Sequence, residues 1–122
     1  MTDRKILRNL HSGILLERNE GPITVSANGN TGMPIRKTSG KKLSIIARLA
    51  QERHFAVRLL YRDLSNNASL GGFWVVDTRV DTVPISWVDA LITIPTSHYR
   101  LQVYNFSADT MEMEHLIVRE LR

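Results

Sequence analysis

Apolar and polar side chains alternate along several long stretches of this chain. Every second residue is apolar over residues 43–49, 55–61 and 99–103. A period of two is typical of a β-strand with one buried face, whereas an amphipathic helix repeats about every 3.6 residues. A helix across residues 41–62 is the competing interpretation, but the Ile, Val, Phe and Tyr side chains at alternating positions favour strands. The sequence therefore predicts an all-β protein.

Turn-forming residues divide the chain into about eight or nine strands, a spacing that is typical of β-sandwiches and barrels. We expect one domain over residues 1–122, with residues 1–10 as a short polar arm. Residues 50–53 are expected to form a hairpin connection, and residues 85–89 either a short strand or part of a loop. Strands are predicted at residues 14–17, 23–27, 33–37, 43–49, 55–62, 73–80, 90–94, 99–106 and 111–121.

Composition limits the classes of protein that this chain can belong to. Its 122 residues are 43% hydrophobic and 23% charged, which is ordinary for a folded domain. The chain has no cysteine, so it has neither disulfides nor thiolate metal sites. No apolar run near the N-terminus is long enough for a signal peptide or a membrane span. The chain is then made inside a cell, is part of a larger protein, or is exported by another route.

The net charge of +4 permits an anionic partner without requiring one. Most cationic residues are spread singly along the sequence, and the adjacent pairs are residues 4–5, 36–37 and 41–42. Charge alone therefore does not favour nucleic acid as the partner over a glycan or a membrane surface.

Four strand segments follow one another over about residues 40–122, namely KKLSIIARL, FAVRLLYRD, GGFWVV and WVDALITIPTSHYRLQVYNFSADTMEMEHLIVREL. The apolar and polar positions of the final two strands are Tyr99, Leu101, Val103 and Asn105, then Met113, Leu116, Val118 and Glu120. This order and these positions resemble the jelly-roll carbohydrate-binding modules. The resemblance implies an antiparallel β-sandwich of jelly-roll type. Other proteins with this sandwich are adhesion modules and phage tail or capsid-associated proteins, so fold alone does not give the function.

The same family often carries a structural calcium ion near the chain ends. The acidic candidates here are Glu17, Glu20, Glu112 and Glu114, but none has a recognisable ligand spacing. We interpret these carboxylates as solvated side chains on strand edges and predict no cofactor.

The sequence offers little support for catalysis. No two of His11, His54, His98 and His115 have the spacing of a zinc pair, and no Gly-x-Ser-x-Gly motif is present. Ser97 and His98 are adjacent, a spacing that usually directs two side chains apart. Asp77, Asp81 and Asp89 are expected at strand ends and turns, where hydrogen bonding to the backbone is the usual role. We therefore predict that the protein is not an enzyme.

Binding is better supported, because arginine, glutamine and aromatic side chains occupy the polar positions of the strands. Sugar hydroxyls need such hydrogen-bonding side chains, and the C–H faces of sugars stack on aromatic rings. If the strands at residues 55–62 and 99–106 are neighbours, these polar side chains share one face of a sheet, and Arg100 belongs to the same face. We expect Trp74 to lie in the core, whereas the sequence does not distinguish a core position from a surface position for Trp87. The predicted ligand-binding residues are Arg58, Arg62, Trp87, Gln102 and Tyr104.

The last predicted strand is partly apolar on both faces. Met111, Met113, His115 and Ile117 alternate on one side, while Leu116 begins an apolar series on the other. Such a strand is either central or covered by another subunit, so a homo-oligomer is one expectation. The sequence thus predicts a lectin-like carbohydrate-binding module with a glycan as partner. The alternative is an oligomeric structural or adhesion protein of a phage or virus particle, in its tail, fibre or capsid.

Overall fold

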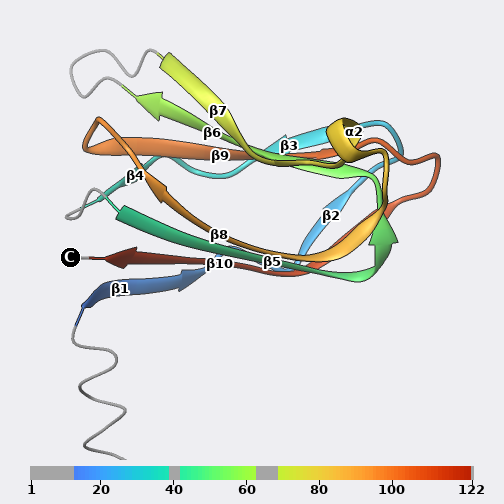
Figure 1. Ribbon diagram of the computed structural model, residues 1–122, viewed down its shortest axis with the longest axis horizontal. Helices are drawn as coiled ribbons and strands as arrows, with labels where there is room; N and C mark the ends of the chain where they lie inside the picture. Colours follow the sequence, from blue (N-terminus) through green and yellow to red (C-terminus); the bar gives the residue numbers. More distant parts are fainter. Residues whose placement is uncertain (1–12, 39–41, 63–68, 122) are drawn as a thin grey trace, which may run out of the picture.

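The computed structural model describes residues 13–38, 42–62 and 69–121, and these form two antiparallel β-sheets packed face to face (Figure 1). The side chains of Arg62, Ser69, Leu70 and Asp81 lie outside this description, as does the expected arm at residues 1–10. The all-β sandwich of jelly-roll type that the sequence predicted is confirmed.

Each sheet contains five strands. The first sheet has the order β1 (Ile14–Asn19), β10 (Met111–Leu121), β5 (Lys42–Arg53) and β8 (Ile85–Thr93), and β2 (Ile23–Val25) also pairs with β10. The second sheet has the order β3 (Asn30–Gly32), β9 (His98–Asn105), β6 (Phe55–Arg62) and β7 (Ser69–Asp77), and β4 (Arg36–Lys37) also pairs with β9. A short helix, α2 (Thr78–Asp81), follows β7.

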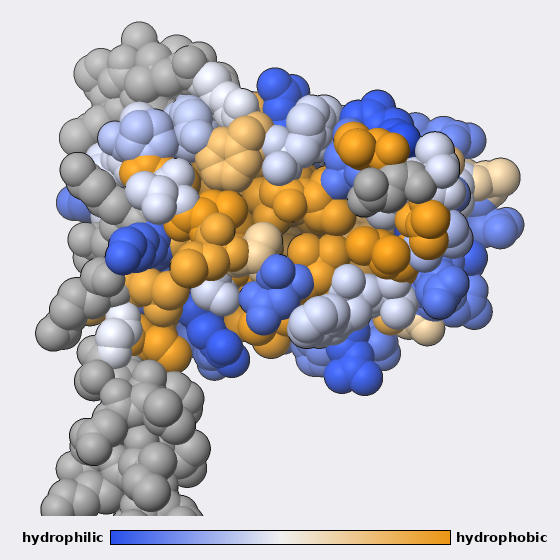
Figure 2. All heavy atoms as spheres, in the orientation of Figure 1, coloured by the Kyte–Doolittle hydropathy of each residue, from blue (hydrophilic) through white to orange (hydrophobic). Residues whose placement is uncertain are grey.

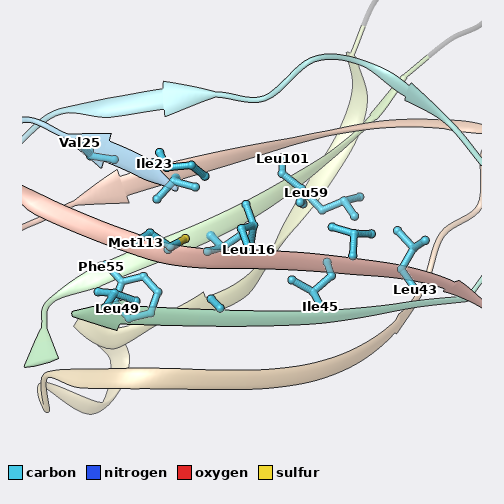
Figure 3. Packing of buried hydrophobic residues seen from close by; sticks show 14 of the residues in the cluster. Ile23, Val25, Leu43, Ile45, Leu49, Phe55, Leu59, Leu101, Met113 and Leu116 are labelled. Carbon is cyan, nitrogen blue, oxygen red and sulfur yellow. The ribbon is translucent and has the colours of Figure 1, made fainter. Parts of the chain in front are cut away.

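The hydrophobic core lies between the two sheets and is built from the alternating apolar residues of the sequence (Figure 3). Phe55, Val57 and Leu59 of β6 are fully buried, as are Leu43 and Ile45 of β5. At the open edge of the sandwich, where β7 and β8 are the outermost strands, the hydrophobic core is partly exposed. Figure 2 shows a band of apolar side chains between the two sheets there. Partly buried members on these two strands are Phe73, Val75, Val76, Ile85, Val88 and Ile92.

The connection after β5 differs from the expected hairpin. Strand β5 extends to Arg53 in the first sheet, whereas β6 begins at Phe55 in the second sheet. The chain therefore crosses between layers at His54, whose Nδ1 lies 3.1 Å from the hydroxyl of Thr78. Residues 85–93 form one continuous strand, so the short strand predicted at 90–94 is part of β8.

A bulge in β10 explains why the last strand looked apolar on both faces. The register with β5 shifts between Met113 and His115, so that Met113 and Leu116 both point into the core. The side-chain oxygen of Asn19 accepts hydrogen bonds from the backbone N–H groups of Leu116, at 3.2 Å, and Gly21, at 3.0 Å. The prediction that Met111, Met113, His115 and Ile117 share one face was therefore wrong, because strict alternation does not continue through a bulge.

Candidate ligand-binding face

The outer face of the second sheet, which points away from the core, carries a group of polar and aromatic residues. One row across its strands consists of Gly32 on β3, Gln102 on β9, Arg58 on β6 and Trp74 on β7. Residues opposite each other in neighbouring strands point to the same face of a sheet. This row therefore presents a guanidinium, an amide and an indole side by side.

Three aromatic rings meet at one end of this row. The rings of Trp74 and Tyr104 pack edge to face with their centroids 5.3 Å apart, and Tyr104 stacks on Phe106 at 6.1 Å. Strand β6 lies between the strands of Trp74 and Tyr104, so the two rings meet across it. Ala56 of β6, opposite Tyr104, is fully buried although it belongs to the outer face. A small residue at this position leaves room for the rings above it.

Two arginines lie over these rings. The guanidinium carbon of Arg58 is 5.4 Å from the centroid of the Trp74 ring, and that of Arg79 is 5.1 Å from it. Arg79 also lies 4.2 Å from the centroid of Phe106. A cation–π contact at an exposed site contributes about 0.5–1 kcal/mol, which is small enough for a ligand to displace the guanidinium. We refer to Arg58, Trp74, Arg79, Tyr104 and Phe106 as the arginine–aromatic cluster.

Asp77 fixes the position of Arg79. Its carboxylate accepts from Arg79 Nε at 3.0 Å and from Nη2 at 2.9 Å, and it also accepts from the backbone N–H of Arg79 as the N-cap of α2. The hydrogen bond from the Arg79 side chain holds the pKa of Asp77 below its usual value. The same hydrogen bond raises the pKa of Arg79. The start of helix α2 at Asp77 therefore places the guanidinium of Arg79 beside Trp74.

Polar groups of β9 complete the face. The hydroxyl of Tyr104 donates to Gln102 Oε1 at 2.8 Å, and Arg100 Nε donates to the carbonyl of Met33 at 2.9 Å. A Cβ atom on Gly32 would overlap the guanidinium of Arg100, so glycine is what allows this arginine to lie across β3. The amide oxygen of Gln102 is thus engaged by Tyr104, while its N–H₂ group makes no hydrogen bond to the other described residues.

The structure brings together three of the five predicted binding residues. Arg58, Gln102 and Tyr104 share the outer face of the second sheet. Arg62 is on the same strand as Arg58, and its backbone pairs with His98 of β9, but its side chain lies outside the described residues. Trp87 is on β8 of the first sheet, where it is 59% exposed, and so it does not join the others.

The prediction that Trp74 belongs to the core was wrong. Its ring is 41% exposed on the outer face, whereas Val76, two residues later, pairs with the buried Val57. The register of β7 against β6 shifts between Val57 and Arg58, and this bulge places Trp74 and Val76 on opposite faces. Arg79 was also missed, because residues 73–80 were predicted as one strand. The order Asp77, Thr78, Arg79 could have indicated a helix start here, because aspartate is a favoured N-cap residue.

One adjacent pair behaves differently from the expectation. The hydroxyl oxygen of Ser97 lies 2.9 Å from Nδ1 of His98, so these side chains meet instead of pointing apart. In the part of the chain that the structure describes, no hydrogen bond joins the His98 ring to a carboxylate, which a catalytic triad would need. Over the same residues, no three His, Asp or Glu side chains are grouped as metal ligands.

A shallow pocket of about 290 Å³ lies on the first sheet, beside β2 and the end of β5. Its lining contains Arg53 and Glu112 together with Thr24, Ala50, Gln51 and Thr110, and it has no aromatic ring. Because this pocket offers no ring for a ligand, the arginine–aromatic cluster is the strongest candidate site.

No helix among the described residues has the length and apolar character to cross a membrane.

Solved structures share this fold at low sequence identity. The PBSX exported protein XepA matches 88% of this chain and 37% of its own, with 10% identity and a TM-score of 0.54. The enzymatically active domain of tailspike protein 4 from bacteriophage CBA120 matches 86% of this chain and 17% of its own, with 10% identity and a TM-score of 0.50. The CBM22-1–GH10 modules of Clostridium thermocellum xylanase 10B match 87% and 26%, with 10% identity and a TM-score of 0.48.

The chain thus spans well under half the length of each of these proteins. No protein-family model and no curated protein matches the sequence. At this level of identity the likeness concerns the fold alone.

Proposed function

We propose that this chain is a non-catalytic carbohydrate-binding module whose ligand lies on the outer face of the second sheet. The observation that carries the proposal is the arginine–aromatic cluster, in which Trp74 and Tyr104 stand beside Arg58 and Gln102. Guanidinium and amide N–H groups donate to sugar oxygens, while aromatic rings contact the C–H groups of a sugar. Arg62 belongs to the same proposal, because its position on β6 lies further along the same strand.

The chain contains two tryptophans, both exposed and on different sheets, which gives a matched pair of variants. The purified protein and its Trp74→Ala, Trp87→Ala, Arg58→Ala and Tyr104→Ala variants would be applied to a glycan array. We expect Trp74→Ala, Arg58→Ala and Tyr104→Ala to lose the glycan signal of the parent protein, while Trp87→Ala retains it. Loss of signal in Trp87→Ala alone would move the site to the first sheet, and no signal for the parent protein would refute the proposal.

A second candidate function is an oligomeric structural or adhesion protein of a phage or virus particle. The observation that favours it is the exposure of Trp87 and Leu91, at 59% and 69%, on β8 at an edge of the first sheet. Large apolar residues on a sheet edge are typical of surfaces that pair with another chain. Light scattering during size-exclusion chromatography decides this point. A stable oligomer that becomes monomeric in Leu91→Arg supports the second candidate, and a monomer at all concentrations argues against it.

A further inference from the structure

The outer face of the second sheet carries more positive than negative charge. Its described carboxylate is that of Asp77, which is engaged by Arg79. The cationic side chains on this face are Lys37, Arg58, Arg79 and Arg100. Clustered cations on one face raise the local concentration of anionic ligands.

The outer face of the first sheet provides the comparison, because both signs of charge are mixed there. Its described cationic residues include Lys42, Arg48 and Arg119, and its acidic residues include Glu17, Asp89, Glu112 and Glu114. Strand β5 also carries one residue of each sign, Glu52 and Arg53, at its end. The positive character is therefore a property of the face that holds the arginine–aromatic cluster, and it does not follow from the net charge of +4 alone.

Arg58 is the cation on this face that is best placed to bind a ligand. Over the described residues, its guanidinium contacts the Trp74 ring and makes no hydrogen bond or ion pair. Arg79 and Arg100, by contrast, donate to Asp77 and to the carbonyl of Met33. A guanidinium presents five N–H donors in a plane that matches a carboxylate or a sulfate. Arg58 therefore holds unused donors beside the amide of Gln102.

The guanidinium groups also determine how a ligand meets Trp74. Because Arg58 and Arg79 both lie over the indole, its ring surface is already in contact with cations. A ligand that approaches the cluster then meets the N–H edges of the arginines before it meets an open aromatic face. This arrangement suits an acidic group better than a neutral sugar ring or a nucleic-acid base, both of which need an open face for stacking.

We infer that the ligand is an acidic polysaccharide, whose carboxylate or sulfate groups dock on Arg58 with support from Arg79. Gln102 and Tyr104 bind the neighbouring hydroxyls. This inference rests on the proposed function and adds the chemical class of the ligand to it.

The test uses affinity electrophoresis of the full chain in gels that contain a polysaccharide. The acidic probes are polygalacturonate, alginate, hyaluronate and dextran sulfate, and the neutral probes are plain dextran and carboxyl-reduced forms of the first three. Arg58→Gln removes one charge from the cluster, and Arg48→Gln removes the same charge from the exposed outer face of the first sheet. We expect Arg58→Gln to weaken binding of an acidic probe by about tenfold or more, and Arg48→Gln by less than about twofold.

A second variant predicts a gain instead of a loss. Asparagine caps a helix as well as aspartate does, so Asp77→Asn keeps the start of α2 and removes the carboxylate that competes for Arg79. We expect Asp77→Asn to bind the acidic probe more tightly by about twofold to tenfold. Because a misfolded variant does not gain affinity, this result separates charge recognition from damage to the fold.

The outcomes distinguish this inference from the proposed function. Binding to dextran sulfate alone identifies sulfate as the acidic group, and binding to the uronate polymers identifies carboxylate. Equal binding to an acidic polymer and its carboxyl-reduced form overturns the acidic class and leaves carbohydrate binding in place. If no polysaccharide binds, both the carbohydrate-binding function and the acidic class of ligand are refuted. Both are also refuted if single-stranded DNA binds in a manner that depends on Arg58 while no polysaccharide binds.

Discussion

The side-chain amide of Asn105, at the end of β9, donates to the backbone carbonyl of Val25 in β2 at 3.1 Å, and so joins the two sheets of the sandwich. The same Nδ2 group lies within hydrogen-bond distance of the carbonyls of Ser26, at 3.1 Å, and Asp109, at 2.8 Å. Its Oδ1 accepts from the backbone and hydroxyl of Ser107. Asn105 is fully buried, and its amide connects backbone groups of three segments, although the carbonyls of Ser26 and Asp109 also accept from Gly29 N–H and from the Ser107 hydroxyl.

Replacement of Asn105 by alanine is expected to lower the free energy of unfolding by about 3 kcal/mol, because the hydrogen bond to Val25 across the sheets and the bond from Ser107 N–H are lost together with the packing of a buried side chain. Urea denaturation measures this loss. Asn30→Ala, at an exposed position of β3, is the control and should change stability by less than about 0.5 kcal/mol. Similar losses in the two variants would show that the cross-sheet hydrogen bonds contribute little.

Glu20 is expected to contribute more to stability than Glu17, although both pair with arginine. The side chain of Glu20 is 6% exposed and receives Arg36 at 3.1 and 3.2 Å, whereas that of Glu17 is 55% exposed beside Arg119. Glu20→Gln leaves Arg36 and Arg18 without this counter-charge and should cost about 1–3 kcal/mol. Glu17→Gln should cost less than about 1 kcal/mol, since exposed ion pairs are weak. Thermal unfolding of both variants checks the order, and the reverse order would contradict it.

Stability is expected to fall at alkaline pH because of Tyr99. Its side chain is buried in the core, and burial raises the pKa of its phenol to about 12. The folded state therefore holds this proton more tightly than the unfolded state, in which the pKa is about 10. The stabilisation is complete below pH 10 and is lost as the pH rises from about 10 to about 12. Denaturation measured across this range should show a decline that is shallower in Tyr99→Phe, and an equal decline in both proteins would contradict the assignment.

The sequence predicts the parts of this fold that depend on uninterrupted alternation. In β9, in β6 and in β5 as far as Leu49, every second residue faces the core, so the buried faces follow from period two alone. This places Arg58, Gln102 and Tyr104 on one outer face. The strands β7 and β10 each contain a bulge, where one extra residue reverses the facing of every residue after it. Trp74 was misplaced for this reason.

The composition of the arginine–aromatic cluster was only partly predictable. Arg79 reaches Trp74 from helix α2, and Phe106 reaches Tyr104 from beyond the end of β9, so neither belongs to the alternating pattern. Trp87 carries the same chemistry as Trp74 in the sequence, but the assignment of β8 to the first sheet separates them. Which strands share a sheet is decided by contacts between distant segments, and these leave no local signal.

Tryptophan fluorescence offers a test of the binding face in proteins whose arginines are intact. Trp87→Phe leaves Trp74 as the single tryptophan, and Trp74→Phe leaves Trp87. A bound polysaccharide on the outer face of the second sheet excludes solvent from the cluster, so acrylamide should quench Trp74 less after the ligand is added. The quenching of Trp87 should stay unchanged, because Trp87 lies on the opposite outer face of the sandwich. Protection of Trp87 and not of Trp74 would assign the ligand to the first sheet, whereas protection of both would indicate that the ligand drives association of the protein.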